Sequence, residues 1–235
     1  MRSVPILAFL VAALALRGTA AAGETSVDGE AADGPDAPVQ ERPVPEPAPL
    51  AGTPQRGAPA VHAARAERAP TIDGRLDDPA WIAAPVFAAF VLNQPTEGGA
   101  GSERTELRVL FDDEYLYVGF HCSDTQPATI SRGRAPRDTE PATDYVAIFV
   151  DAGNDGRTAR RFYLNAASVQ ADTLIYDDIQ WMQSWDAVWD GAATVTADGW
   201  SAEYAIPLHV VGVDARQPRW GFLARRYVAR THELV

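Results

Sequence analysis

From residue 61 onward, hydrophobic and polar residues alternate along much of the chain, which is the pattern of strands that bury one face. The segment 106–111 places three large apolar side chains on one side, and 115–122 repeats this after an acidic turn at 112–114. Two alternating runs joined by a short polar turn are typical of a β-hairpin. The pattern therefore predicts antiparallel pairing between these two segments.

Later segments continue in the same way. Residues 145–150 are apolar at successive positions, as expected for a strand covered on both faces. No strong amphipathic helix separates the segments, and Pro207 is expected to end a strand or mark an edge. We therefore predict an all-β fold, an antiparallel, jelly-roll-like β-sandwich, in preference to a βαβ fold. Further strands are expected at four segments: 161–165, 168–176, 199–206 and 220–227.

The first 60 residues have a different texture. Residues 1–22 combine Arg2, an apolar run at 4–16 and three alanines at 20–22, which is typical of a secretory signal peptide. The alternative, a retained membrane anchor, is less favoured because about 20 apolar residues are needed to span a bilayer. Residues 23–60 are rich in Pro, Ala, Gly and acidic residues and predict a disordered linker.

One folded domain at 61–235 remains, and it would carry the function. Removal of the signal peptide implies an exported bacterial protein that is periplasmic, outer-membrane-associated or extracellular. The formal net charge of −12 argues against a nucleic-acid partner, because such proteins carry a basic patch. The single cysteine excludes an intrachain disulfide, and Cys122 in an apolar run predicts a buried, inert thiol.

Catalytic and metal-binding motifs are weak in this chain. The four histidines lack partners at metal-ligand spacing, and no nucleophile elbow, phosphate loop or dinucleotide fingerprint occurs. We therefore expect no enzymatic activity. Oxygen ligands do recur in the loop at Asp151, Asn154 and Asp155, which is compatible with calcium. The competing interpretation, a turn whose side chains satisfy local backbone groups, is favoured.

Aromatic residues give the more specific hypothesis. Trp185 and Trp189 lie among polar neighbours, and a spacing of four places their rings on one side of a strand or a helical turn. A sugar site combines such rings with a few polar groups, which Tyr163, Asn165 and Gln170 of the preceding hairpin would supply. Burial in the core is the alternative for both rings. Three other tryptophans are expected in the core: Trp81, Trp200 and Trp220.

Four segments in order resemble family 9 carbohydrate-binding modules. They are PTIDGRLDDPAW at 70–81, LRVLFDDEYLYVGFHCSD at 107–124, DYVAIFVD at 144–151 and DGWSAEYAIP at 198–207. The resemblance implies a β-sandwich that binds a saccharide or polysaccharide without catalysis, and some members bind calcium. It spans essentially all of the predicted folded domain.

A finer resemblance links 151–172 and WDAVWDG at 185–191 to the amino-terminal domain of large exported bacterial proteins. The rest of those proteins is an uncharacterised domain, DUF5916, thought to be an outer-membrane β-barrel. Their chains continue for hundreds of residues beyond the point that matches Val235, which leaves open whether this chain is a fragment. The alternative function is thus a structural or docking domain beside such a barrel that binds no sugar.

The match departs from the family at the binding face. In well-studied members a sugar-clamping tryptophan lies three residues before the aspartate that matches Asp144, and that position is Pro141 here. A second clamping tryptophan would lie beyond the end of this chain. Asn165 matches an asparagine of the binding face, but the neighbouring arginine is replaced by Tyr163. The resemblance therefore supports the fold more strongly than the ligand.

Overall fold

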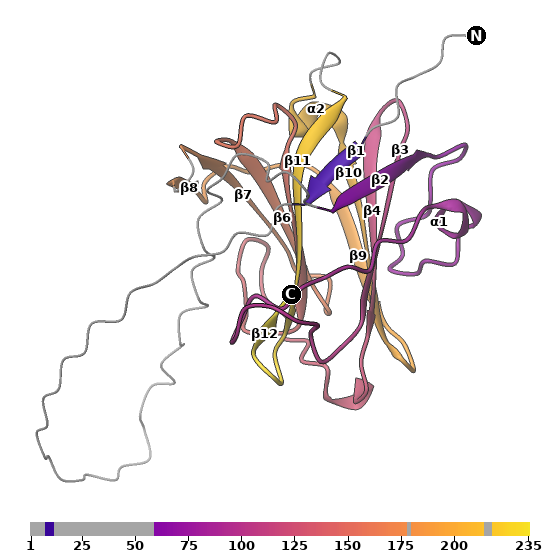
Figure 1. The fold of residues 1–235 in the computed structure, drawn as a ribbon, viewed down its shortest axis with the longest axis vertical. Helices are drawn as coiled ribbons and strands as arrows, with labels where there is room; N and C mark the ends of the chain where they lie inside the picture. The colour runs from indigo at the N-terminus through magenta and orange to yellow at the C-terminus, as the bar shows by residue number, and fades with distance from the viewer. Residues whose placement is uncertain (1–7, 12–58, 178–179, 214–217) are drawn as a thin grey trace, which may run out of the picture.

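The computed structural model describes residues 8–11, 59–177, 180–213 and 218–235. In these residues twelve strands form two layers that face each other across a shared core (Figure 1). The first layer, sheet A, has the order β8-β7-β6-β5-β11, with antiparallel pairing throughout. Its strands are β5 (Tyr145–Asp151), β6 (Ala159–Asn165), β7 (Gln170–Tyr176), β8 (Gln180–Met182) and β11 (Arg219–Val228), and β12 (Glu233–Leu234) pairs with β11.

The second layer, sheet B, has the order β2-β3-β4-β10-β9. β2 pairs with β3 in parallel, and the other neighbours are antiparallel. A short strand, β1 (Ala8–Val11), lies between β11 and β2 and joins the two layers. The strands of sheet B are β2 (Ala60–Arg65), β3 (Thr105–Phe111), β4 (Tyr115–Ser123), β9 (Asp190–Val195) and β10 (Gly199–Pro207).

β1 lies within the predicted signal peptide, so cleavage near residue 22 would remove it from the sheet. The rest of that peptide, and the predicted linker apart from its last two residues, lie outside the described residues. Short helices complete the fold: α1 (Pro79–Ala83), the 3₁₀ turn η1 (Pro127–Thr129) and α2 (Leu208–Val211). None of the helices in the described part of the chain is long and apolar enough to cross a membrane.

The predicted β-sandwich and its strands are confirmed. The hairpin of β3 and β4 pairs as the alternation indicated, and Pro207 is the last residue of β10. The buried core lies between the layers and includes Trp200 and Trp220, while Trp81 is buried on the other side of sheet B. Cys122 is fully buried, and burial raises the pKa of its thiol to about 12, as expected for an inert group.

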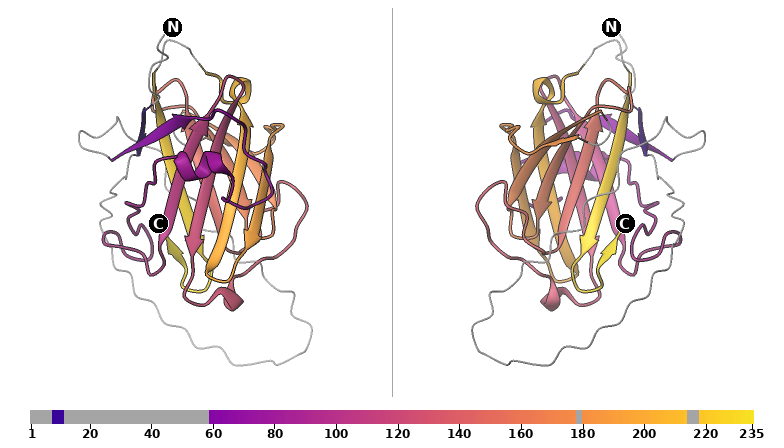
Figure 2. Two further views of the ribbon diagram at one scale, coloured as in Figure 1. Left: turned by 90° about the vertical axis from the view of Figure 1, so that its right-hand side faces the viewer. Right: turned by 90° about the vertical axis from the view of Figure 1, so that its left-hand side faces the viewer.

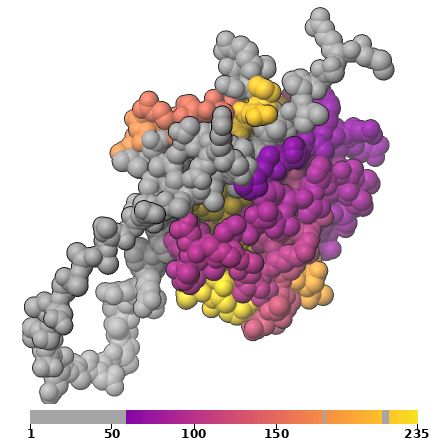
Figure 3. Space-filling view, in the orientation of Figure 1, coloured from indigo at the N-terminus to yellow at the C-terminus, as the bar shows by residue number. Residues whose placement is uncertain are grey.

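The outer face of sheet B is covered by the segment that precedes and includes α1. In Figure 2 (left) α1 lies across the strands of this sheet, and the same part of the chain is purple in the space-filling view of Figure 3. Trp81 is fully buried there beside Leu110 and Tyr117. A ligand surface on the sheets therefore has to be sought on sheet A or at the ends of the sandwich.

Glu203 on β10 explains how the covering segment is anchored. Its carboxylate is fully buried and accepts hydrogen bonds from the backbone N–H groups of Asp73 (2.9 Å), Gly74 (2.6 Å) and Arg75 (3.1 Å). Its other oxygen accepts the indole N–H of Trp81 at 2.7 Å. Gly74 has φ +85°, and a Cβ there would meet the backbone of sheet B at 2.7 Å, so the turn requires glycine.

Candidate functional site

Figure 2 (right) shows the outer face of sheet A. Tyr163 and Asn165, which the sequence resemblance matched to the family's binding face, lie on it and define the family-type face. Tyr163 points outward from β6, but it is fully buried. A loop at 131–143 packs over it, and the Tyr163 hydroxyl donates to the carbonyl of Pro141 at 3.4 Å. The next outward residue, Arg161, forms a two-contact ion pair with Glu140 of the same loop. The loop therefore covers this part of the face.

Asn165 is also outward on β6 and fully buried, and its amide is satisfied within the protein. Its NH₂ group donates to the carbonyl of Gly133 (2.9 Å) and the hydroxyl of Thr143 (3.0 Å). Its oxygen accepts from the backbone N–H groups of Ala167 (2.9 Å) and Val169 (2.8 Å). All four hydrogen-bonding positions are occupied, so Asn165 shapes the β6–β7 turn and has none left for a ligand.

Gln170 lies on the opposite face of the hairpin from Tyr163 and Asn165, because it pairs with an inward residue of β6. Its amide oxygen accepts from Arg137, and its NH₂ group donates to the carbonyl of Gly191 at 3.0 Å. The expectation that these three polar side chains line one sugar-binding surface is therefore wrong. The hairpin alternates, and Gln170 falls on the core side.

Trp189 is a core residue, with only 5% of its surface exposed. Its indole N–H donates to the carboxylate of Asp172 at 2.9 Å. The ring stacks on Tyr204 with centroids 5.4 Å apart and an interplanar angle of 13°, and the Arg137 guanidinium lies 5.6 Å from its centroid. The open stacking surface that the sequence suggested for Trp189 is not available, because these neighbours cover the ring.

Trp185 is placed differently, at the edge of the core. Its ring packs edge-on against Phe162, with the ring centroids 6.1 Å apart, and part of the indole remains exposed. Trp185 and Trp189 share this neighbour, because the ring centroids of Trp189 and Phe162 are 5.5 Å apart. Trp185 lines an open pocket of about 440 Å³ between the segment before β9 and α2. The other lining residues are Arg160, Asp186, Ala187, Val188, His209 and Val210.

The pocket combines this indole with polar and charged side chains. Arg160 reaches it from β6 and His209 from α2. Asp186 is largely exposed, and its carboxylate lies 3.7 Å from the guanidinium of Arg137. An aromatic platform beside a few polar side chains is the arrangement that holds a small polar ligand with a partly apolar face.

The acidic loop after β5 is a turn in the structure. The Asp151 carboxylate accepts from the backbone N–H of Gly156 at 2.8 Å, and Asp155 accepts from the N–H of Arg157 at 2.7 Å. Asn154 has φ +51°, a turn conformation that asparagine tolerates. Within the described residues no group of three or more His, Cys, Asp or Glu side chains is arranged to hold a metal ion.

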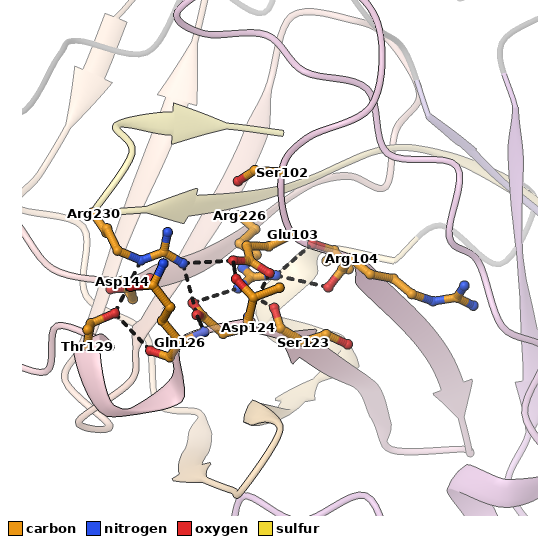
Figure 4. Close-up of polar contacts among 12 residues, drawn as sticks. Ser102, Glu103, Arg104, Ser123, Asp124, Gln126, Thr129, Asp144, Arg226 and Arg230 are labelled. Atoms are coloured by element: carbon orange, nitrogen blue, oxygen red, sulfur yellow. Dashed lines mark hydrogen bonds and ion pairs between the residues drawn. The ribbon is translucent and has the colours of Figure 1, made fainter.

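A second polar cluster lies where β3 begins and β4 and β11 end (Figure 4). Arg230 donates to Glu103 at 2.7 Å and to Asp124 at 2.9 Å. Arg226 is fully buried, donates to the carbonyl of Ser123 at 2.8 Å and lies 3.8 Å from Asp124. These ion pairs tie the strand ends together, and a third carboxylate, Asp144, lies buried in the same cluster and interacts with the charge of Arg226.

Two pocket residues, Arg160 and His209, were not identified from the sequence. They are separated from Trp185 by 25 and 24 positions on opposite sides, and neither has a neighbour that forms a recognisable motif. The pocket forms because α2, which directly follows β10, lies over the first residues of β6, where Arg160 is located. Only the pairing of the strands reveals this proximity.

Comparisons with known proteins agree on the fold. The family model described as "Carbohydrate family 9 binding domain-like" matches residues 72–229. A carbohydrate binding module family 9 from Caldicellulosiruptor kristjanssonii in complex with cellotriose has 16% identity and a TM-score of 0.51, over 74% of this chain and 80% of that chain. One from the same organism in complex with glucose has 16% identity and a TM-score of 0.50, over 73% and 82%. No curated protein sequence matches the chain.

Proposed function

Because the chain belongs to the carbohydrate family 9 binding domain-like family, we propose that it is a non-catalytic module that binds a saccharide or polysaccharide at the Trp185 pocket. The observation that carries this proposal is a partly exposed indole lining an open pocket together with polar side chains. The C–H face of a sugar ring packs on such an indole, and the charged groups meet its hydroxyls. The cellotriose and glucose complexes of the structural relatives support the ligand class.

The proposed site differs from the family-type face. There, the loop at 131–143 covers Tyr163 and satisfies part of Asn165, so a sugar would have to displace it. The Trp185 pocket is already open and needs no such rearrangement. Stacking on one ring is worth about 0.5–2 kcal/mol, by analogy with aromatic pairs and cation–π contacts.

The test is titration calorimetry of the full chain with glucose, cellobiose and cellotriose. Trp185→Ala should weaken binding by roughly threefold to thirtyfold. Trp181→Ala is the matched control, since that indole lies on the outer face of sheet A against Phe149, away from the pocket. A parent protein with no affinity for any saccharide would favour the alternative, a docking domain, and equal losses in both variants would reject the pocket.

Export is the second part of the proposal and rests on Arg2 and the apolar and small residues that follow within 1–22. Cleavage should leave a mature protein that begins near Gly23, which amino-terminal sequencing of material from the periplasm or medium would detect. An intact Met1 in that material would refute this.

A further inference from the structure

The Trp185 pocket contains a cation that lacks a close counter-charge. Arg160 is half-buried, and within the described part of the chain none of its guanidinium nitrogens lies within ion-pair distance of a carboxylate. Burial lowers the pKa of Arg160, and the charge of Asp151 offsets this only in part. A desolvated guanidinium with free N–H donors is costly unless something else satisfies it.

The fold keeps this guanidinium at the pocket. Gly212, which ends α2 with φ +70°, has no side chain to occupy the space, and a Cβ there would lie 2.8 Å from a guanidinium nitrogen of Arg160. The backbone after α2 therefore approaches Arg160 closely from one side. On the other side the pocket is open and is bounded by the Trp185 indole.

The remaining charges near the pocket do not neutralise Arg160. Asp186 is the acidic lining residue, but its side chain is 77% exposed and its carboxylate faces Arg137. His209 is the third ionisable group of the lining. The pocket thus presents one partly desolvated cation beside an aromatic ring, on a chain whose overall charge of −12 disfavours non-specific attraction of polyanions.

We propose that this pocket selects a saccharide that carries a carboxylate, a uronate residue, with the carboxylate on Arg160 and the sugar ring on Trp185. The inference rests on the proposed function and adds its ligand class. A planar guanidinium matches a carboxylate through two parallel hydrogen bonds, and such charge-assisted pairs are roughly twice as strong as neutral ones. A neutral sugar would offer Arg160 only hydroxyl oxygens.

The experiment compares cellobiouronate with cellobiose in calorimetric titrations of the full chain. The parent protein should bind the uronate about tenfold more tightly, which corresponds to one strong charge-assisted contact. Arg160→Gln should bring the ratio of the two affinities close to one, and Arg160→Lys, which retains the charge but not the fork, should leave an intermediate ratio. Arg157→Gln is the control, because Arg157 is exposed and pairs with Asp177 at 2.9 Å.

The outcomes separate this inference from the proposed function. If the parent binds cellobiose as tightly as the uronate, the pocket binds sugar but the ligand class is wrong. If the preference survives in both Arg160 variants, the carboxylate is recognised elsewhere and the inference is overturned. If the parent binds neither of these sugars, nor glucose or cellotriose, the proposed function fails as well. Melting curves of each variant establish that it is folded, and Arg160→Lys provides the test if Arg160→Gln is not.

Discussion

Glu203 offers a sharp test of how the covering segment is attached to sheet B. In the Glu203→Gln variant one oxygen remains to accept the three backbone N–H groups of residues 73–75. The new NH₂ group then faces the indole N–H of Trp81, which lies 2.7 Å from the Glu203 oxygen in the parent. An amide nitrogen cannot accept this N–H, whereas a carboxyl oxygen accepts it whether the group is ionised or protonated. A buried donor without an acceptor costs about 1–3 kcal/mol, which is the loss of stability we expect near pH 5.

The loss should depend on pH, with a sign that follows from linkage. Burial raises the pKa of Glu203 from 4.5 to about 7, although the four N–H donors favour the carboxylate. Between these values the folded protein retains a proton that the unfolded chain has released. The stability due to this group is therefore complete below pH 4.5 and is lost as the pH rises through about 7.

Glutamine does not titrate. The difference in unfolding free energy between the parent and Glu203→Gln should therefore shrink between pH 5 and pH 8, by on the order of 3 kcal/mol at most. Urea unfolding of both proteins at the two pH values measures this difference. Glu114→Gln makes the same chemical change at an exposed turn and should be neutral at both. A variant as stable as the parent at pH 5, or a difference that widens at pH 8, would refute the reasoning.

Three further predictions concern other parts of the fold. Arg226→Met should cost about 3–5 kcal/mol in urea unfolding, because it leaves part of the buried charge of Asp124 unpaired, and a neutral effect would contradict a stabilising role for this ion-pair cluster. Trp189→Ala should also cost about 3–5 kcal/mol by opening a cavity, and a melting temperature close to that of the parent would show that the ring is not in the core. Millimolar calcium should leave the melting temperature unchanged if the Asp151 loop is only a turn, whereas a rise would reveal a bound ion.

The strands were predictable because burial of one face imposes a period of two on the sequence. This signal is strong where large side chains alternate with polar ones, as in β3, β4 and β10. It is absent from β9 (Asp190–Val195), whose small residues pack without a marked pattern, and from the three-residue β8. Both strands exist because a longer neighbour provides backbone hydrogen bonds, which leaves little trace in composition.

The site was predictable only in part, because depth of burial is a tertiary property. The spacing of four between Trp185 and Trp189 predicted rings on one side of the segment, and in the structure both rings pack against Phe162. It could not indicate that one ring stacks on Tyr204 in the core while the other lines a pocket. Alternation also gives relative faces but not which face is covered, so Tyr163 was placed correctly on β6 and yet lies beneath a loop.

Asn165 separates the family-type face from the pocket by experiment. If Asn165 contacts a ligand, as its counterpart in the family would, Asn165→Ala should weaken saccharide binding with little change in stability. The structure leads to the opposite expectation, since alanine leaves two backbone N–H groups of the β6–β7 turn and the carbonyl of Gly133 without partners. We expect a loss of about 2–4 kcal/mol in urea unfolding and an unchanged affinity per folded molecule. Asn93→Ala, on a half-buried loop residue whose backbone N–H pairs with Leu234, is the control for the substitution itself. Weaker binding by a fully folded Asn165→Ala protein would return the site to the outer face of sheet A.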